Sequence, residues 1–269
     1  MRFPTFFVSH GGGPWPWMKD EWHGAYDQLA AALRRLPQDA GLVRPKAVLM
    51  ISAHWEEPEF TVQSHPEPGM IYDYGGFPDY TYRIRYPAPG SPALAQRVQG
   101  LLRSAGIAAR EDAERGFDHG MYAPMVVSYP EADMPTVQLS LKRGLDPQDH
   151  LALGRALAPL RDEDVLIIGS GLSYHNLRSF GPQAKGPSAA FDAWLDESLA
   201  APGAPRSAAL AAWAQAPSAR QAHPREEHLL PLMVAIGAAE PDPAQRVYHE
   251  AGFFGGITVS SWRFGAPVA

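Results

Sequence analysis

The chain has 269 residues, of which 45% are hydrophobic and 19% charged, a composition typical of folded globular proteins and unlike that of disordered ones. Its net charge of −6 gives no electrostatic reason to expect a nucleic acid or an anionic membrane surface as a partner. Because the chain contains no cysteine, it cannot use disulfides, thiolate zinc sites or cysteine nucleophiles, and any transition metal must be held by histidine and carboxylate side chains.

The chain shows no internal repeat, low-complexity tract or linker, and we predict one domain over residues 1–269. No segment approaches the length of an apolar membrane span, and the first apolar run has the wrong flanks for a signal peptide. We therefore expect a cytoplasmic protein.

The first element is an apolar, aromatic run from Pro4 to Ser9, which ends in His10, three glycines and Pro14. The run predicts a buried strand, and the glycines predict a loop in which the backbone turns sharply or approaches another group closely. His10 thus follows a strand end, where ligand-binding groups are common.

The same pattern recurs twice. The apolar run 47–53 leads into His54, and the apolar run 165–171 leads into His175. If these strands lie parallel in one sheet, His10, His54 and His175 meet at its carboxyl edge, the usual binding crevice of open α/β sheets.

The remaining periodic segments alternate between helix and strand, which predicts an α/β protein, a three-layer αβα sandwich with a central, largely parallel (mixed) sheet. The expected helices are 20–36, 91–105, 121–129, 147–160, 187–200, 207–214 and 223–239, and the further strands are 60–63, 107–110, 136–141, 247–249 and 257–262.

Residues 65–90 form a long segment without periodicity that contains five prolines, five tyrosines and Phe77. Loops of this length in compact domains are often lids or binding loops. Two interpretations are open: a lid or pocket wall, or an irregular surface segment packed by its own tyrosines.

Two further histidines have supporting context. His119 lies in a glycine-flanked loop, and His228 ends the segment HPREEH. On the expected helix 223–239, His223 and His228 are separated by about 140° and cannot face one ion. His228 shares its stripe with Leu232 and is the candidate. The other histidines, His23, His65, His150 and His249, have no such context, and we expect them to be structural or exposed.

Other chemistries find no support in the motifs. A lipase-like oxyanion loop would require a serine in a G-x-S-x-G turn, and Gly169-Ser170-Gly171-Leu172-Ser173 has the wrong register. Phosphate-binding glycine motifs are also missing from the sequence. A histidine metal site is the chemistry that remains.

Six motifs along nearly the whole chain resemble the DODA-type branch of the class III extradiol ring-cleaving dioxygenases, a group that includes 4,5-DOPA dioxygenases and is related to the protocatechuate 4,5-dioxygenase catalytic subunit. They are SHGGGP, SAHWE, YGGFPDYTYRIRYPAPG, GFDHG, GLSYHN and HPREEHLLPL. The resemblance implies a single catalytic αβα domain with one divalent metal at the sheet's carboxyl edge, Fe(II) for dioxygenase activity and often Zn(II) as found.

The resemblance also implies the roles of single residues. The metal ligands would be His10, His54 and His228; His175 matches the family's acid/base histidine, which can be a fourth metal contact, and His119 matches a histidine beside the substrate. Other class III enzymes complete the site with a glutamate where this branch has histidine. The histidine set alone fits Zn, Fe, Ni or Cu.

We therefore expect an extradiol dioxygenase that opens a small aromatic diol with O₂. Its substrate pocket would be formed by Phe77, Tyr80, Trp15 and Tyr122. The alternatives are a zinc-dependent hydrolase on the same scaffold and a non-catalytic metal-binding protein of the same fold. We expect no nucleic-acid or membrane partner, and a monomer or small homo-oligomer.

Overall fold

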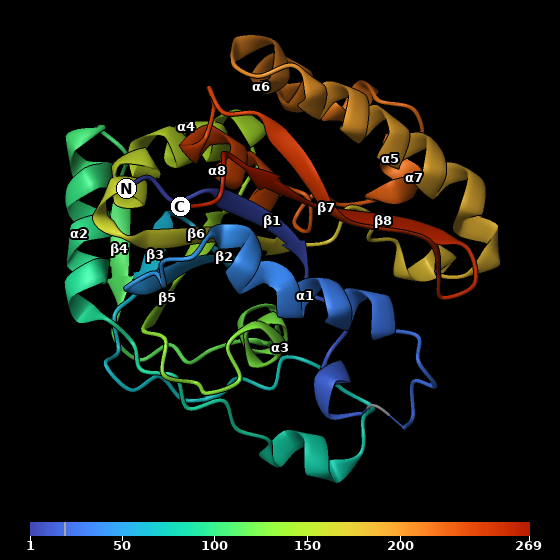
Figure 1. Ribbon diagram of the computed structural model, residues 1–269, viewed down its shortest axis with the longest axis horizontal. Coiled ribbons are helices and arrows are strands. Elements are labelled where there is room, and N and C mark those ends of the chain that lie inside the picture. The colour runs from blue at the N-terminus through green and yellow to red at the C-terminus, as the bar shows by residue number, and fades with distance from the viewer. Residues whose placement is uncertain (19) are drawn as a thin grey trace.

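The centre of the fold is a mixed sheet of eight strands, seen in a computed structural model that describes residues 1–18 and 20–269 (Figure 1). Across the sheet the strands follow the order β4-β3-β5-β2-β6-β1-β8-β7. The strands are β1 (Thr5–Ser9), β2 (Ala47–Glu57), β3 (Phe60–Gln63), β4 (Ala109–Asp112), β5 (Thr136–Lys142), β6 (Val165–Gly171), β7 (Ala244–Phe253) and β8 (Ile257–Phe264).

The middle of the sheet is parallel. β6 pairs in parallel with β1 on one side and β2 on the other, and β2 pairs in parallel with β5. β8 and β7 extend the sheet in antiparallel fashion beyond β1. All residues of β1 and β6 are buried, as expected of strands covered on both faces. The predicted αβα sandwich with a largely parallel, mixed sheet is confirmed.

Helices cover both faces of the sheet (Figure 1). On one face α1 (Asp27–Ala40) packs against α3 (His119–Ser128), which contacts β2. On the other face α8 (Leu230–Ala238) packs on β1 and β6 and against α4 (Pro147–Leu157). The remaining helices are α2 (Pro92–Ser104), α5 (Lys185–Ala200), α6 (Ala204–Ala211) and α7 (Ala219–Ala222).

α8 is the central helix of its layer, and every one of its residues is buried. Two glycines allow this close packing, because a Cβ at Gly169 of β6 would overlap the carbonyl oxygen of Pro231, and one at Gly154 of α4 would overlap that of Val234. The position of α8 matters for the site, since the residues just before it lie at the carboxyl edge of the sheet.

Two predicted helix starts are wrong. The expected helix 223–239 begins only at Leu230, so His228 lies in a turn rather than on a helix. Pro231 occupies the first turn of α8, where its missing N–H and fixed φ suit a helix start. The expected helix 20–36 begins at Asp27 and continues to Ala40 with Pro37 inside it.

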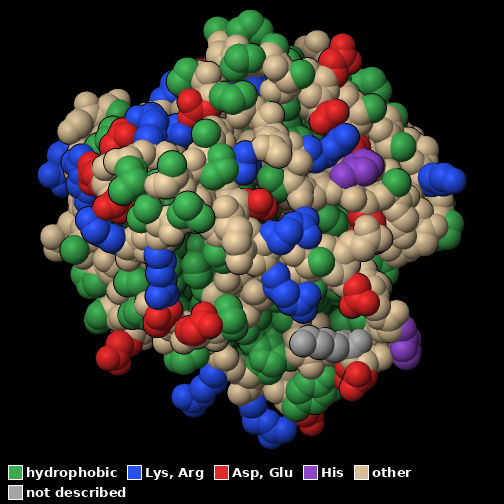
Figure 2. Space-filling model, in the orientation of Figure 1, with side chains coloured by type: hydrophobic (Ala, Val, Ile, Leu, Met, Phe, Trp, Pro, Cys, Tyr) green, Lys and Arg blue, Asp and Glu red, His purple; other side chains and the backbone are tan. Residues whose placement is uncertain are grey.

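Residues 65–90 form a loop that contains one short 3₁₀ helix, Asp79–Arg83, and we call it the aromatic loop. Within the described ranges 1–18 and 20–269, no helix has both the length and the apolar character needed to cross a membrane. On the face shown in Figure 2, Lys, Arg, Asp and Glu side chains are interspersed with hydrophobic ones.

Candidate active site

Three of the predicted histidines occupy the carboxyl edge of the sheet. His10 follows β1, and its backbone N–H donates to Gly171 O at the end of β6 (3.1 Å). His54 lies in the last part of β2, where the pairing with β5 shifts register. His175 follows β6, and its backbone N–H donates to Ala222 O of α7 (2.9 Å).

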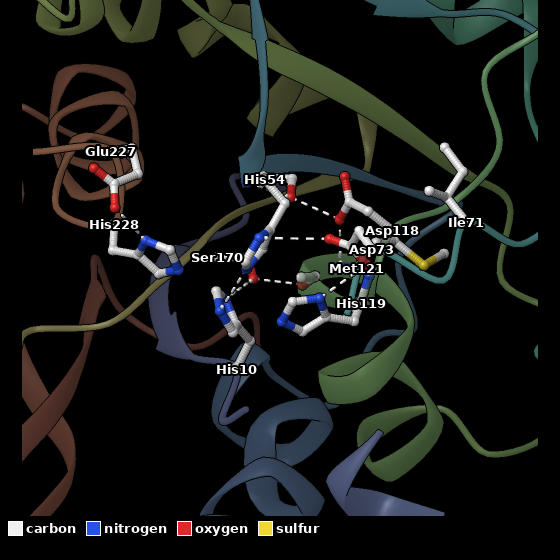
Figure 3. Close-up of polar contacts among 12 residues, drawn as sticks. His10, His54, Ile71, Asp73, Asp118, His119, Met121, Ser170, Glu227 and His228 are labelled. Atoms are coloured by element: carbon white, nitrogen blue, oxygen red, sulfur yellow. Dashed lines mark hydrogen bonds and ion pairs between the residues drawn. The ribbon is translucent and has the colours of Figure 1, made fainter. Parts of the chain in front are cut away.

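His119 and His228 reach the same place from other elements. His119 is the first residue of α3, whose N-cap Asp118 accepts a hydrogen bond from Met121 N (3.3 Å). His228 lies in the turn of residues 227–229, directly before α8. The rings of His10, His54, His119 and His228 converge in Figure 3.

The distances between ring centroids show how closely the five histidines lie together. The ring centroids of His10 and His54 are 4.9 Å apart, and His228 lies 5.2 Å from His10 and 4.8 Å from His54. His119 is 3.9 Å from His54 and 5.4 Å from His10. His175 stacks on His228 with centroids 3.4 Å apart. Nitrogen atoms of His10, His54 and His119 lie within 4.8 Å of one another, and a second such group comprises His175, Glu227 and His228.

The Nδ1 atom of each of these five histidines has a partner outside the cluster, and two carboxylates supply four of these contacts. Asp73 lies 2.9 Å from Nδ1 of His119 and 3.4 Å from Nδ1 of His54. Glu227 Oε1 lies 3.1 Å from Nδ1 of His175 and 3.0 Å from Nδ1 of His228. Since a carboxylate only accepts hydrogen bonds, these contacts favour the tautomer that carries the proton on Nδ1 and the lone pair on Nε2.

Ser170 is the partner of Nδ1 of His10. Its hydroxyl donates to the carbonyl oxygen of Gly120, so its oxygen can accept from Nδ1–H of His10 at 3.0 Å. Nε2 of His10 is then also free to bind a ligand.

Burial keeps the central rings uncharged. The pKa values of His10 and His228 are lowered well below the usual range, first by burial and then by neighbouring histidines. Burial, followed by the charge of His119, lowers the pKa of His54 to about 4. Neutral imidazole at neutral pH is the form that binds metals.

The two carboxylates remain ionised despite burial. Burial acts to raise the pKa of Asp73, but hydrogen bonds and charge from His119 outweigh it and lower that pKa. Burial likewise opposes ionisation of Glu227, and the hydrogen bond from His175 lowers its pKa overall. Two negative charges therefore flank the cluster, in which burial keeps His10, His54 and His228 uncharged.

The donor set fits a divalent transition metal. Nε2 of His10 and Nε2 of His54 are 3.1 Å apart. Two nitrogens about 2.1 Å from one ion would have this separation at an angle of about 95°. Imidazole nitrogens with their Nδ1 atoms hydrogen-bonded outward are typical of metal ligands.

The four predicted pocket residues have different surroundings. The ring of Phe77 packs against the backbone of Gly13 and lies 5.4 Å from the ring of Tyr74, and the ring of Tyr74 lies 6.0 Å from that of His119.

The other three residues each have a hydrogen-bond partner within the protein. Tyr122 is buried and donates to Ile71 O (3.3 Å). Trp15 is buried and donates to His10 O (2.7 Å). Tyr80 is 41% exposed and donates to Glu21 (2.5 Å).

A cavity of about 370 Å³ lies away from the histidines. It is lined by residues of α1, by the end of α3 and by the segment before α1, which contributes Trp15, Trp17, Trp22 and Tyr26. Among the described residues that line this cavity, there is no histidine of the cluster.

Three residues of this site were not predicted from the sequence: Asp73, Glu227 and Ser170. Asp73 is 46 positions from His119, and Ser170 is 160 positions from His10, so no local pattern links either pair. For Glu227 the expected helix was misleading, because in a helix its side chain would face away from His228.

Comparisons with known proteins show the family of this chain. Residues 4–265 match the family model of the catalytic LigB subunit of aromatic ring-opening dioxygenase. The chain is 39% identical over 267 residues to a 4,5-DOPA dioxygenase extradiol of Beta vulgaris, covering 97% of this chain and 96% of the relative. It is 35% identical to the dioxygenase tasH of Hapsidospora irregularis, covering 91% of this chain and 81% of the relative.

A solved structure has a similar fold. The crystal structure of the uncharacterized protein JW3007 from Escherichia coli K12 superposes with a TM-score of 0.78 at 29% sequence identity, covering 98% of this chain and 100% of that chain.

Proposed function

The chain belongs to the family of the catalytic LigB subunit of aromatic ring-opening dioxygenases and is an extradiol ring-opening enzyme, and we propose that it cleaves a catechol-type aromatic with O₂ at a mononuclear non-haem metal centre. The observation that carries the proposal is the histidine cluster itself. Each of its Nδ1 atoms is engaged outside the cluster, so the free Nε2 lone pairs can serve one metal and one bound substrate.

The proposed ligands are His10, His54 and His228. Their ring centroids form a nearly equilateral triangle with sides of 4.9, 5.2 and 4.8 Å. His119 is the rival third ligand, because its nitrogen groups with those of His10 and His54. A divalent metal bound there supplies Lewis acidity toward the catechol hydroxyls and holds both reactants in one place.

His175 is the proposed acid and base. Its side chain is partly exposed, it stacks on His228, and Glu227 holds its Nδ1 proton. Nε2 is then free to accept the second catechol proton and to return it later, a role suited to imidazole near neutral pH. With its Nδ1 proton directed to Asp73, neutral His119 would accept a hydrogen bond from a substrate hydroxyl through Nε2, and it would donate one only after that nitrogen is protonated.

The proposed substrate-binding residues are Phe77, Tyr80, Trp15 and Tyr122. The support differs among them: Phe77 connects through Tyr74 to His119, and Tyr122 contacts the aromatic loop. An aromatic surface of this kind suits a planar ring, which loses little conformational freedom on stacking.

Oxygen uptake with defined metals tests the function. The metal-free protein would be loaded anaerobically with Fe(II) or Zn(II) and mixed with aerated buffer and a panel of catechols. We expect oxygen consumption and a ring-opened product with Fe(II) only. Hydrolysis of an ester or amide panel by the Zn(II) form, together with no oxygen uptake by the Fe(II) form, would favour a zinc hydrolase and overturn the proposal.

Metal content tests the ligand set. His228→Ala and His119→Ala would be compared with His249→Ala, whose side chain is 41% exposed. We expect His228→Ala to lose its metal on dialysis while the other two variants retain it. A His119→Ala protein that loses metal while His228→Ala remains loaded would transfer the third ligand position to His119.

A further inference from the structure

We propose that Asp73 is a positioning residue that links the aromatic loop to the metal centre, so that docking of the loop and binding of the metal stabilise one another. This inference rests on the proposed function only in taking His54 as a metal ligand. It gives the aromatic loop a second role, in addition to any contact with the substrate.

Asp73 holds two histidines at once. Its Oδ1 atom accepts from both the backbone N–H of His119 (3.0 Å) and Nδ1 of the same residue (2.9 Å), and Oδ2 lies 3.4 Å from Nδ1 of His54. The side chain is only 19% exposed, although the residue as a whole is exposed. The exposed surface of Asp73 therefore belongs mainly to its backbone, and Figure 3 shows the carboxylate directed toward His54 and His119.

The segment that carries Asp73 is fixed on both sides. Before it, Ile71 N donates to Phe117 O and Phe117 N donates to Gly69 O, each at 2.7 Å. After it, the Tyr74 hydroxyl donates to Thr81 O (2.7 Å), which closes the loop on itself. Asp73 thus lies between the two hydrogen bonds that join residues 69–71 to Phe117 and the hydrogen bond that closes the aromatic loop at Thr81. Moving the loop outward would withdraw the Asp73 carboxylate from His54 and His119.

Each histidine held by Asp73 depends on that carboxylate for its tautomer. Oδ1 accepts from Nδ1 of His119, and Oδ2 faces Nδ1 of His54 at 3.4 Å, so the carboxylate favours the Nδ1–H tautomer of both rings, in which Nε2 is free. Without the carboxylate, neither Nδ1 has this partner, and the Nε2–H tautomer becomes competitive. Nε2–H cannot bind a metal, so loop docking and metal affinity must be coupled, and the coupling must be equal in both directions.

Asparagine at position 73 separates the two contacts. Its amide oxygen can keep both bonds from His119, but its NH₂ group then faces Nδ1 of His54 and donates to it. His54 is driven to the Nε2–H tautomer and is lost as a ligand. The matched control is Asp79→Asn, which makes the same change at an exposed acid of the same loop.

The test uses metal affinity, the visible spectrum of the Co(II)-loaded protein and trypsin cleavage at Arg83 and Arg85, two exposed sites in the loop. We expect Asp73→Asn to weaken metal affinity by about 10- to 100-fold, the usual effect of removing a residue that orients a metal ligand. Its Co(II) absorption bands should shift, and Asp79→Asn should match the wild type in both measurements.

Cleavage of the wild-type protein tests the coupling without any substitution. Metal should slow cutting at Arg83 and Arg85 in the wild type and in Asp79→Asn, and much less in Asp73→Asn. Equal metal affinity and equal protection in Asp73→Asn and wild type, or a wild-type loop cut at the same rate with and without metal, would overturn the inference. None of these readouts requires ring-cleaving activity, so failure of the proposed function would not be confused with failure here.

Discussion

Replacing Glu227 by glutamine tests how the site holds its acid/base histidine and its proposed third ligand. Oε1 of Glu227 accepts from Nδ1 of His175 (3.1 Å) and Nδ1 of His228 (3.0 Å), and Oε2 lies 3.4 Å from Arg225. Glutamine can keep its oxygen toward the histidines only by turning its NH₂ group toward Arg225. In either orientation the substitution removes the negative charge that Glu227 places beside His175, His228 and Arg225.

The magnitude follows from the two hydrogen bonds. A hydrogen bond to a charged group contributes about 1.5–3 kcal/mol and a neutral one about 0.5–1.5 kcal/mol, so each bond to Nδ1 weakens by about 1 kcal/mol. Two bonds together give about 2 kcal/mol, or about 30-fold. We expect this loss to divide between metal affinity, through His228, and kcat, through His175.

The assay measures metal content and steady-state oxygen uptake at saturating Fe(II). The control is Glu226→Gln, one residue earlier, where the carboxylate pairs with Arg220 (2.6 Å) rather than with a histidine. If Glu227→Gln and Glu226→Gln have the same metal affinity and kcat, the two hydrogen bonds do not support the site as argued.

Two other predictions concern acid stability and substrate binding. His150 is buried, donates from Nδ1 to Asp146 O (2.7 Å) and accepts at Nε2 from Lys142 N (3.3 Å); burial lowers its pKa to about 4. The unfolded state binds the proton first, so stability falls as pH decreases from about 6.5 to about 4, by about 3 kcal/mol from this group. Urea unfolding at pH 7 and pH 4 should show that the free energy of unfolding of His150→Gln falls by about 3 kcal/mol less than that of the wild type. Equal decreases in the two proteins would refute this prediction. Phe77→Ala should raise KM by about two- to tenfold without metal loss, the range for an aromatic contact, and Tyr80→Ala should raise it less, because its ring is half-exposed; equal KM values for the two variants would contradict this order.

The gathering of histidines could be predicted because it depends on local signals. Apolar runs that end in His10, His54 or a loop with His175 mark strand ends, and parallel strands bring their carboxyl ends to one edge. The structure confirms these strands as β1, β2 and β6.

The features that could not be predicted from the sequence depend on tertiary contacts or on which proline begins a helix. Pro224 and Pro231 both suit a helix start, and the sequence does not distinguish them; the structure begins α8 around Pro231. That choice leaves Glu227 and His228 in a turn, where the carboxylate reaches Nδ1. Asp73 belongs to a loop without periodicity, and its contact with His119 exists only once the loop has docked.

The most direct test of the central claim is isotope incorporation. The Fe(II)-loaded protein would be given ¹⁸O₂ and the catechol that supports the fastest oxygen uptake, and the ring-opened product would be analysed by mass spectrometry. A dioxygenase that uses this histidine cluster should place both atoms of ¹⁸O₂ in the product, and His175→Ala should slow that incorporation while retaining its iron. A product whose new oxygen comes from water, or which forms equally well without O₂, would contradict the account.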